Sequence, residues 1–164
     1  MKVSANEEYG LRCLVRLGYV DRDGGTLTIP EMSQAEGVSP AYAAKILRVL
    51  RKGGFVKAAR GKDGGYTLAR PAEEILIGEV IASLGGRLFE SNFCDRHAGR
   101  GTTCTRSVDC SVRPVWRAVQ GAVDEVLSRT TLRDLLENNE QEMNSWVRTV
   151  HGATIQWLPA PSPR

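Results

Sequence analysis

The chain has 164 residues, of which 41% are hydrophobic and 25% charged, an ordinary composition for a soluble globular protein of one domain with an appended element. Its net charge is only +3, and no apolar run approaches the roughly 20 residues that a transmembrane helix needs. The first residues lack the apolar core of a secretory signal, so we expect a cytoplasmic protein without a membrane partner.

The charge is unevenly distributed along the chain. Residues 45–70 contain eight basic residues and one acidic residue, a local charge of +7, which leaves −4 for the remainder of the chain. A basic segment in an otherwise mildly acidic chain is typical of proteins that bind nucleic-acid phosphates. The alternative is an ordinary solvated basic face, and charge alone leaves both open.

The first predicted element is a helix over residues 4–20. Ser4 and Glu7 have the spacing of a capping box, in which each side chain accepts a hydrogen bond from the other residue's backbone. Apolar residues then recur at helical intervals from Leu11 to Leu17. A turn rich in aspartate and glycine is expected at residues 21–25.

Two further helices are predicted to form a helix-turn-helix. A short helix covers residues 28–36, and a second begins with Ser39 as its N-cap and runs to Lys52. The connection between them is the short, glycine-containing pair Gly37-Val38. This arrangement is typical of DNA-binding proteins whose second helix lies in the major groove.

Two short strands are predicted after the helix-turn-helix, over residues 55–60 and 66–70, with a glycine-rich loop between them. A basic-tipped hairpin directly after a recognition helix is a wing. The predicted fold is therefore mainly α-helical with a small β-wing. A further helix is predicted over residues 73–84, and residues 88–111 show no useful periodicity.

A long amphipathic helix is predicted from Val112, because apolar residues recur at helical spacing as far as Leu127. A small domain cannot cover so long a stripe, so we expect it to form a homodimer interface; packing across its own winged-helix domain is the alternative. A shorter helix is expected over 131–144. The predicted organisation is a winged helix-turn-helix domain over 1–86, a cysteine-rich loop over 87–111, a dimerisation helix and final helix over 112–145, and a flexible tail over 146–164.

The candidate DNA-binding residues lie on the third helix and on the wing. They are Ser39, Tyr42, Lys45, Arg48, Arg60 and Lys62. Arg48 or Lys45 would donate to guanine, whereas Ser39 and Tyr42 at the helix start would contact phosphate. For each residue the alternative is an ordinary solvated side chain. A symmetric dimer predicts a palindromic double-stranded operator and strongly salt-dependent binding.

Three of the four cysteines fall within seventeen residues, spaced as Cys94-x9-Cys104-x5-Cys110. Clustered cysteines in a cytosolic protein are typical of metal binding or catalysis rather than of disulfides. Zinc sites usually have ligand pairs two to four residues apart, and only Cys94-x2-His97 approaches that spacing. Iron–sulfur clusters accept wider spacing on loops. Spacing alone leaves a structural zinc site and an iron–sulfur cluster open.

The remaining cysteine, Cys13, lies beside the apolar stripe of the first helix, where a small buried hydrophobe is the expected role. The sequence contains no Cys-x-x-Cys motif, nucleotide-binding loop or catalytic dyad. We therefore do not expect an enzyme.

Five features follow one another in a characteristic order: EYGLR at 8–12, VSPAYAAK at 38–45, RGKDGGYTL at 60–68, IGEVI at 77–81, and the three cysteines. Over about residues 1–140 the chain thereby resembles the winged-helix iron–sulfur transcription regulators of the IscR/NsrR/RirA type. The resemblance implies that Cys94, Cys104 and Cys110 hold a 2Fe-2S or 4Fe-4S cluster. It also implies a homodimeric regulator, with repression expected, that senses redox state, nitric oxide or iron supply.

The fourth cluster ligand differs among members of this family. IscR-type members have a histidine three residues after the last cysteine, where this chain has Arg113. In NsrR-type members an acidic residue of the partner subunit completes the site, and Glu8 stands at the matching position. His97 and Asp95 are rival ligands, and the alternative reading of Glu8 is a charge favoured by the dipole of the first helix.

Overall fold

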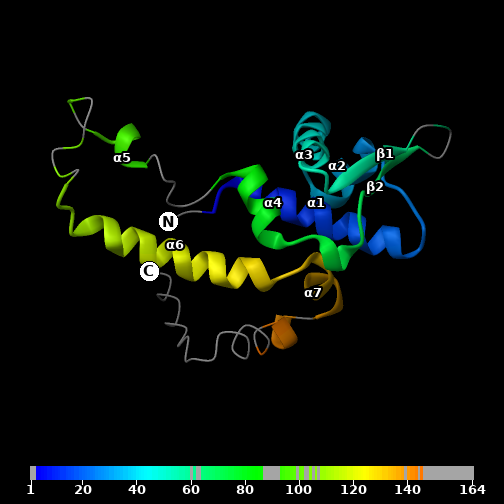
Figure 1. The fold of residues 1–164 in the computed structure, drawn as a ribbon. Coiled ribbons are helices and arrows are strands. Elements are labelled where there is room, and N and C mark those ends of the chain that lie inside the picture. The colour runs from blue at the N-terminus through cyan, green and yellow to red at the C-terminus, as the bar shows by residue number, and fades with distance from the viewer. Residues whose placement is uncertain are drawn as a thin grey trace, which may run out of the picture.

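The computed structural model describes residues 3–59, 61, 64–86, 93–98, 100, 101, 104, 106, 108–138, 140–143 and 145. Within these ranges the fold is mainly α-helical with one two-stranded sheet, as predicted (Figure 1). The elements in chain order are α1 (Ala5–Arg22), α2 (Ile29–Glu36), α3 (Pro40–Lys52), β1 (Val56–Ala59), β2 (Gly65–Leu68), the 3-10 helix η1 (Ala72–Glu74), α4 (Ile77–Leu84), α5 (Phe93–Arg96), α6 (Val112–Arg129) and α7 (Leu132–Glu137).

Reciprocal side-chain caps fix where two of the first helices begin. The Ser4 backbone N–H donates to Glu7 Oε2 at 2.6 Å, and the Glu7 N–H donates to Ser4 Oγ at 3.3 Å. The predicted capping box of α1 is therefore confirmed. Thr28 and Glu31 repeat the arrangement at the start of α2. Each box satisfies backbone N–H groups that have no partner within the helix.

One continuous hydrophobic core connects the helices. α1 packs against α2, α3, α4, α7 and β2, and in Figure 1 it lies between the helix-turn-helix on one side and α7 on the other. The buried apolar residues are Cys13, Leu14, Leu17, Met32, Ala43, Ile46, Leu47, Leu50, Phe55, Val56, Leu68, Ile75, Ile77, Val80, Leu132 and Leu136. The helical spacing of these residues on α1 and α3 turns one face of each helix inward.

The wing is an antiparallel hairpin in which Val56 pairs with Leu68 and Ala59 with Gly65. Leu27, in the connection between α1 and α2, adds a bridge to Tyr66 through two backbone hydrogen bonds of 3.0 and 2.7 Å. The wing is thus tied to the helix-turn-helix.

The prediction of one continuous helix over residues 73–84 is wrong. η1 ends at Glu74, and α4 begins only at Ile77. Between them the Ile75 carbonyl accepts from Leu132 N at 2.8 Å, and Ile77 N donates to the Thr130 carbonyl at 2.9 Å. A continuous helix would use these backbone groups internally, whereas here they join the start of α4 to the start of α7.

The long helix predicted from Val112 is confirmed as α6, whose 18 residues span about 27 Å. The final helix predicted over 131–144 is interrupted, because α7 ends at Glu137 and helical structure returns at residues 140–143. The expected tail over 146–164 lies outside the described residues. α5, in the segment without periodicity, was not expected. No helix within the described ranges is both long and apolar enough to span a bilayer.

The α2–α3 turn gives a test of the helix-turn-helix geometry. Gly37 has φ 66° and ψ 32°, a left-handed conformation that costs a residue with a Cβ about 1 kcal/mol. We expect Gly37→Ala to lower the free energy of unfolding in urea by about that amount. The matched control is Gly121→Ala, in the open on α6, which we expect to raise stability by up to about 1 kcal/mol. A Gly37→Ala variant as stable as the wild type would contradict this geometry.

Candidate nucleic-acid interface and cysteine site

The outer face of α3 is exposed and basic. Its inner face is held in the core by residues such as Ile46 and Leu47. Opposite them, the exposed polar residues of α3 and its N-cap are Ser39, Lys45, Arg48, Arg51 and Lys52. α3 contains no acidic residue, so this face offers a positive surface of the kind that phosphates and base acceptors bind.

Two of the predicted contact residues also have partners within the protein. Ser39 Oγ accepts from Tyr42 N at 3.2 Å as the N-cap of α3. The Tyr42 hydroxyl donates to Asn6 Oδ1 at 2.9 Å, and its ring meets the ring of Tyr9 edge to face at 5.9 Å. Tyr42 is therefore half-buried between α1 and α3, whereas the prediction placed it toward phosphate.

Among the described basic residues of the wing and its flank, one is exposed and one is paired within the protein. Lys57 on β1 is exposed. Arg70, which belongs to the same basic segment, donates to Glu79 Oε2 at 2.5 Å and lies 5.3 Å from the ring centroid of Phe55. It is thus used inside the protein. The candidate residues Arg60 and Lys62 at the wing tip lie outside the described residues.

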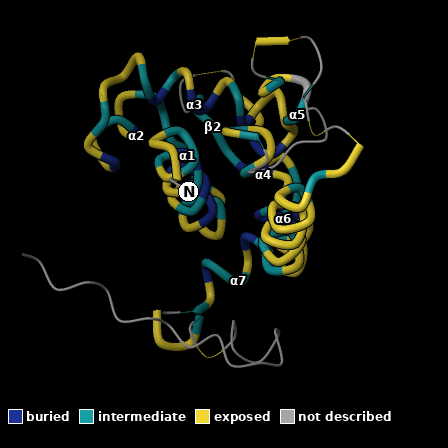
Figure 2. Tube along the Cα trace, turned by 90° about the vertical axis from the view of Figure 1, so that its left-hand side faces the viewer, coloured by how far each residue is buried: buried dark blue, intermediate teal, exposed yellow. Residues whose placement is uncertain are grey.

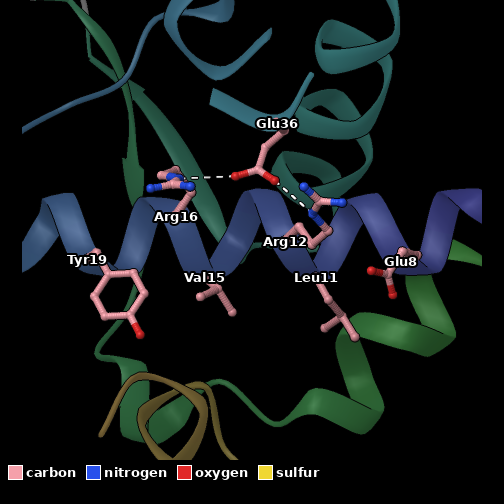
Figure 3. Close-up of a pocket in the computed structure, with 7 residues that line it drawn as sticks. All are labelled: Glu8, Leu11, Arg12, Val15, Arg16, Tyr19 and Glu36. Carbon is pink, nitrogen blue, oxygen red and sulfur yellow. Dashed lines mark hydrogen bonds and ion pairs between the residues drawn. The ribbon is translucent and has the colours of Figure 1, made fainter. Parts of the chain in front are cut away.

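A groove of about 300 Å³ runs along α1 (Figure 3). Its lining residues are Glu8, Leu11, Arg12, Val15, Arg16, Tyr19 and Glu36. Figure 3 shows Glu36 between Arg12 and Arg16 on one side of α1, and Leu11, Val15 and Tyr19 on the other. The groove combines an apolar row with paired charges.

Glu36, the last residue of α2, carries the charge that holds this groove together. Its side chain is 4% exposed, and its two oxygens accept from Arg12 Nε at 2.9 Å and Arg16 Nε at 3.1 Å. A buried carboxylate needs such partners, because transfer of an unpaired charge out of water is costly. Our sequence interpretation missed this cluster; the available signal was a pair of arginines one helical turn apart on α1.

The four cysteines are all free thiols, and they occupy two kinds of environment. Cys13 is fully buried, and burial, with the nearby Glu36 carboxylate, raises the pKa of its thiol to about 12. Cys94, Cys104 and Cys110 are half-buried. Backbone N–H groups of Arg113 and Val112 at the start of α6 lower the pKa of Cys110, which favours its thiolate. The expectation that Cys13 is a buried hydrophobe is confirmed.

The candidate ligands that the structure describes do not come together as a metal site within one chain. Among the described residues, no three cysteine, histidine, aspartate or glutamate side chains come together as a metal site. Glu8 is exposed on α1 beside the groove, while Cys94 lies on α5. His97 stacks on Phe93, with Nδ1 2.8 Å from the Phe93 carbonyl oxygen, which leaves its Nε2 for any ligand. The Asp95 side chain lies outside the described residues. The thiol chemistry fits an iron–thiolate site, but the described residues of a single chain do not assemble one.

Comparison with known proteins gives one consistent result. The model of a family described as "Rrf2: Iron-dependent Transcriptional regulator" matches residues 3–138. A helix-turn-helix-type transcriptional regulator of Mycobacterium tuberculosis is 33% identical over 135 residues, covering 82% of this chain and 81% of that protein. That protein is named as a transcriptional regulator, in agreement with the expectation that this chain is not an enzyme.

Solved structures agree with the sequence match. IscR of T. potens superposes with a TM-score of 0.67 at 32% identity, covering 86% of this chain and 90% of that one. CymR, the global cysteine regulator of B. subtilis, superposes with a TM-score of 0.64 at 26% identity, covering 85% and 99%. The predicted winged-helix fold is thereby confirmed.

The contrast between the thiols predicts their reactivity in iron-free protein. Because the thiolate is the nucleophile, we expect iodoacetamide at pH 7 to modify Cys110 at least about tenfold faster than Cys13. The lowered pKa of Cys110 enlarges its thiolate fraction, and the raised pKa of Cys13 keeps it protonated. Peptide mass spectrometry measures both rates. Unfolding in guanidinium should abolish the difference, and equal rates in the native protein would contradict the assignment.

Proposed function

Because the chain is a DNA-binding transcription regulator that belongs to the Rrf2 family, we propose that it is a homodimeric repressor whose grip on its operator depends on an iron–sulfur cluster. The observation that carries the proposal is the separation of its thiols. Three cysteines stay half-buried outside the core, whereas the fourth is sealed inside it. Thiols that only fill space are expected in the core, so the outer three point to ligation.

DNA recognition is proposed for the outer face of α3. Lys45 and Arg48 are exposed there and would reach base edges in the major groove. Ser39 at the helix start, and Arg60 and Lys62 on the wing, would contact the DNA backbone or minor groove, whereas the Tyr42 hydroxyl predicted for this role is bound to Asn6. The exposed basic face without acidic residues supports this assignment.

Dimerisation is proposed for the first half of α6. Val112, Val115, Trp116 and Val119 are 54%, 58%, 44% and 36% exposed, and Figure 2 shows α6 exposed along most of its length. An apolar row of this kind on a soluble protein marks a surface that another chain covers. Pairing of the same stripe in two copies gives a two-fold axis and two recognition helices, hence a palindromic operator.

The cluster ligands are proposed to be Cys94, Cys104 and Cys110, with Glu8 of the second subunit as the fourth. Exposure of Glu8 on α1 is compatible with a ligand that serves another chain. Once bound, a 2Fe-2S or 4Fe-4S cluster would supply a group sensitive to oxidants, nitric oxide or iron shortage. The family description names iron. We place the protein in the cytoplasm, where thiols stay reduced. Regulation then requires two dimer arrangements with different DNA affinity.

Metal analysis tests the cluster. We expect protein purified without oxygen, with cluster-assembly machinery supplied, to be brown, to absorb at roughly 400 nm and to contain iron and inorganic sulfide. Cys110→Ser should lose most of the iron, and the matched control Cys13→Ala should keep it, because Cys13 is sealed in the core. Colourless protein with stoichiometric zinc, or protein without iron and sulfide, would refute the proposal.

Selection from a random-sequence duplex library with the full chain tests the DNA interface. We expect the selected duplexes to have two-fold symmetric half-sites about one helical turn apart or a multiple of it. Arg48→Ala should weaken binding to them by about tenfold or more. The matched control Arg133→Ala, an exposed arginine on α7 that pairs with Glu137, should not. Unchanged affinity after one half-site is scrambled would contradict a dimeric reader.

A further inference from the structure

We propose that Tyr9 and Arg12 on α1 are positioning residues for DNA recognition: they hold Tyr42 and, through it, Lys45 on the recognition helix α3. The inference rests on the proposed function only in that α3 must read DNA. In this inference, side chains of α1 influence operator binding although they do not contact the duplex. It also changes the role of Tyr42 from a phosphate contact to a link between two helices.

The hydroxyl of Tyr42 is held by α1. A tyrosine hydroxyl has one hydrogen to donate, and here it donates to Asn6 Oδ1 at 2.9 Å. Phosphate oxygens only accept hydrogen bonds. Tyr42 therefore cannot donate to a phosphate while it is bound to Asn6, and the tether to α1 competes directly with the phosphate contact.

The ring of Tyr42 lies between Tyr9 and Lys45. It meets the ring of Tyr9 at 5.9 Å between centroids and 85° between planes, an edge-to-face geometry that aromatic pairs favour. On α3 itself, Lys45 Nζ lies 5.9 Å from the same Tyr42 ring, three residues along the helix. A shift of the Tyr42 ring would thus move a neighbour of the Lys45 ammonium group, which is otherwise exposed.

Tyr9 is in turn held by Arg12. The Arg12 guanidinium lies 5.2 Å from the Tyr9 ring centroid, and Arg12 Nε donates to the buried carboxylate of Glu36 at 2.9 Å. Glu36 ends α2, only three residues before the N-cap of α3. A closed path of contacts therefore runs from the end of α2 through Arg12 and Tyr9 to the start of α3. Arg12 also lines the α1 groove, so the groove and the path that leads to α3 share one residue.

A double-mutant cycle tests the path. The probe is the duplex selected by the wild-type full chain, with affinities measured by fluorescence anisotropy. We expect Tyr9→Leu to weaken binding about fivefold and Lys45→Ala about tenfold. In the Tyr9→Leu background, Lys45→Ala should then cost no more than about twofold, because the ammonium is already misplaced. The matched control is Tyr19→Leu, an exposed tyrosine on the same helix that stacks with Arg22; its effect should be additive with Lys45→Ala.

The outcomes separate the inference from the function on which it rests. Additive losses for Tyr9 and Lys45 would overturn the inference and leave DNA reading by α3 intact. If Lys45→Ala alone caused no loss of DNA affinity, both the inference and the reading of DNA by Lys45 on α3 would be overturned. A purely structural role for Tyr9 predicts a lower melting temperature with an unchanged cost of Lys45→Ala, which would also overturn the inference.

A milder pair of variants keeps the test decisive if Tyr9→Leu fails to fold. Asn6→Ala and Tyr42→Phe each remove one end of the same hydrogen bond. We expect similar losses of affinity, about twofold to fivefold, and no further loss in the double variant. A loss for Tyr42→Phe with none for Asn6→Ala would instead mean that the hydroxyl contacts phosphate, and the inference would be wrong.

Discussion

The buried carboxylate of Glu36 joins α1 to the end of α2, next to the helix that we propose to read DNA. A charge removed from water must be paired, and both of its oxygens are held by arginines of α1. Glu36 is followed directly by the left-handed Gly37 and the start of α3. Pairing Glu36 to α1 therefore ties the end of α2 to α1, directly before the turn that leads into α3. The buried residues of α3, such as Ile46 and Leu47, pack into the core and leave its basic face outward.

The cysteines show how position decides the chemistry of one residue type. Cys13 lies in the core of α1, where burial keeps it neutral, and Cys110 lies before α6, where backbone N–H groups favour its thiolate. α5, which bears Cys94, and the strands β1 and β2 lie at opposite ends of the molecule in Figure 1. In the proposed function, a signal received at the thiols would have to cross the molecule to reach α3.

Local signals in the sequence predict much of this fold. Ser4 with Glu7, and Ser39 followed by Pro40, place helix starts correctly because helix caps act between residues that are close in the chain. The break between η1 and α4 was missed because it depends on hydrogen bonds that the Ile75 carbonyl accepts and the Ile77 N–H donates, both with partners more than fifty positions away. The same limit applies to the site. The basic face of α3 follows from its periodicity, but Tyr42 contacts Asn6 and Tyr9, which precede it by 36 and 33 positions.

A crystal structure of the full chain bound to its selected duplex tests the central claim most directly. The account predicts α3 of each subunit in the major groove, with Lys45 and Arg48 at base edges and the Tyr42 hydroxyl still on Asn6. Its contradiction would be a duplex seated on another face of the protein, or a Tyr42 side chain turned away from α1 onto a phosphate.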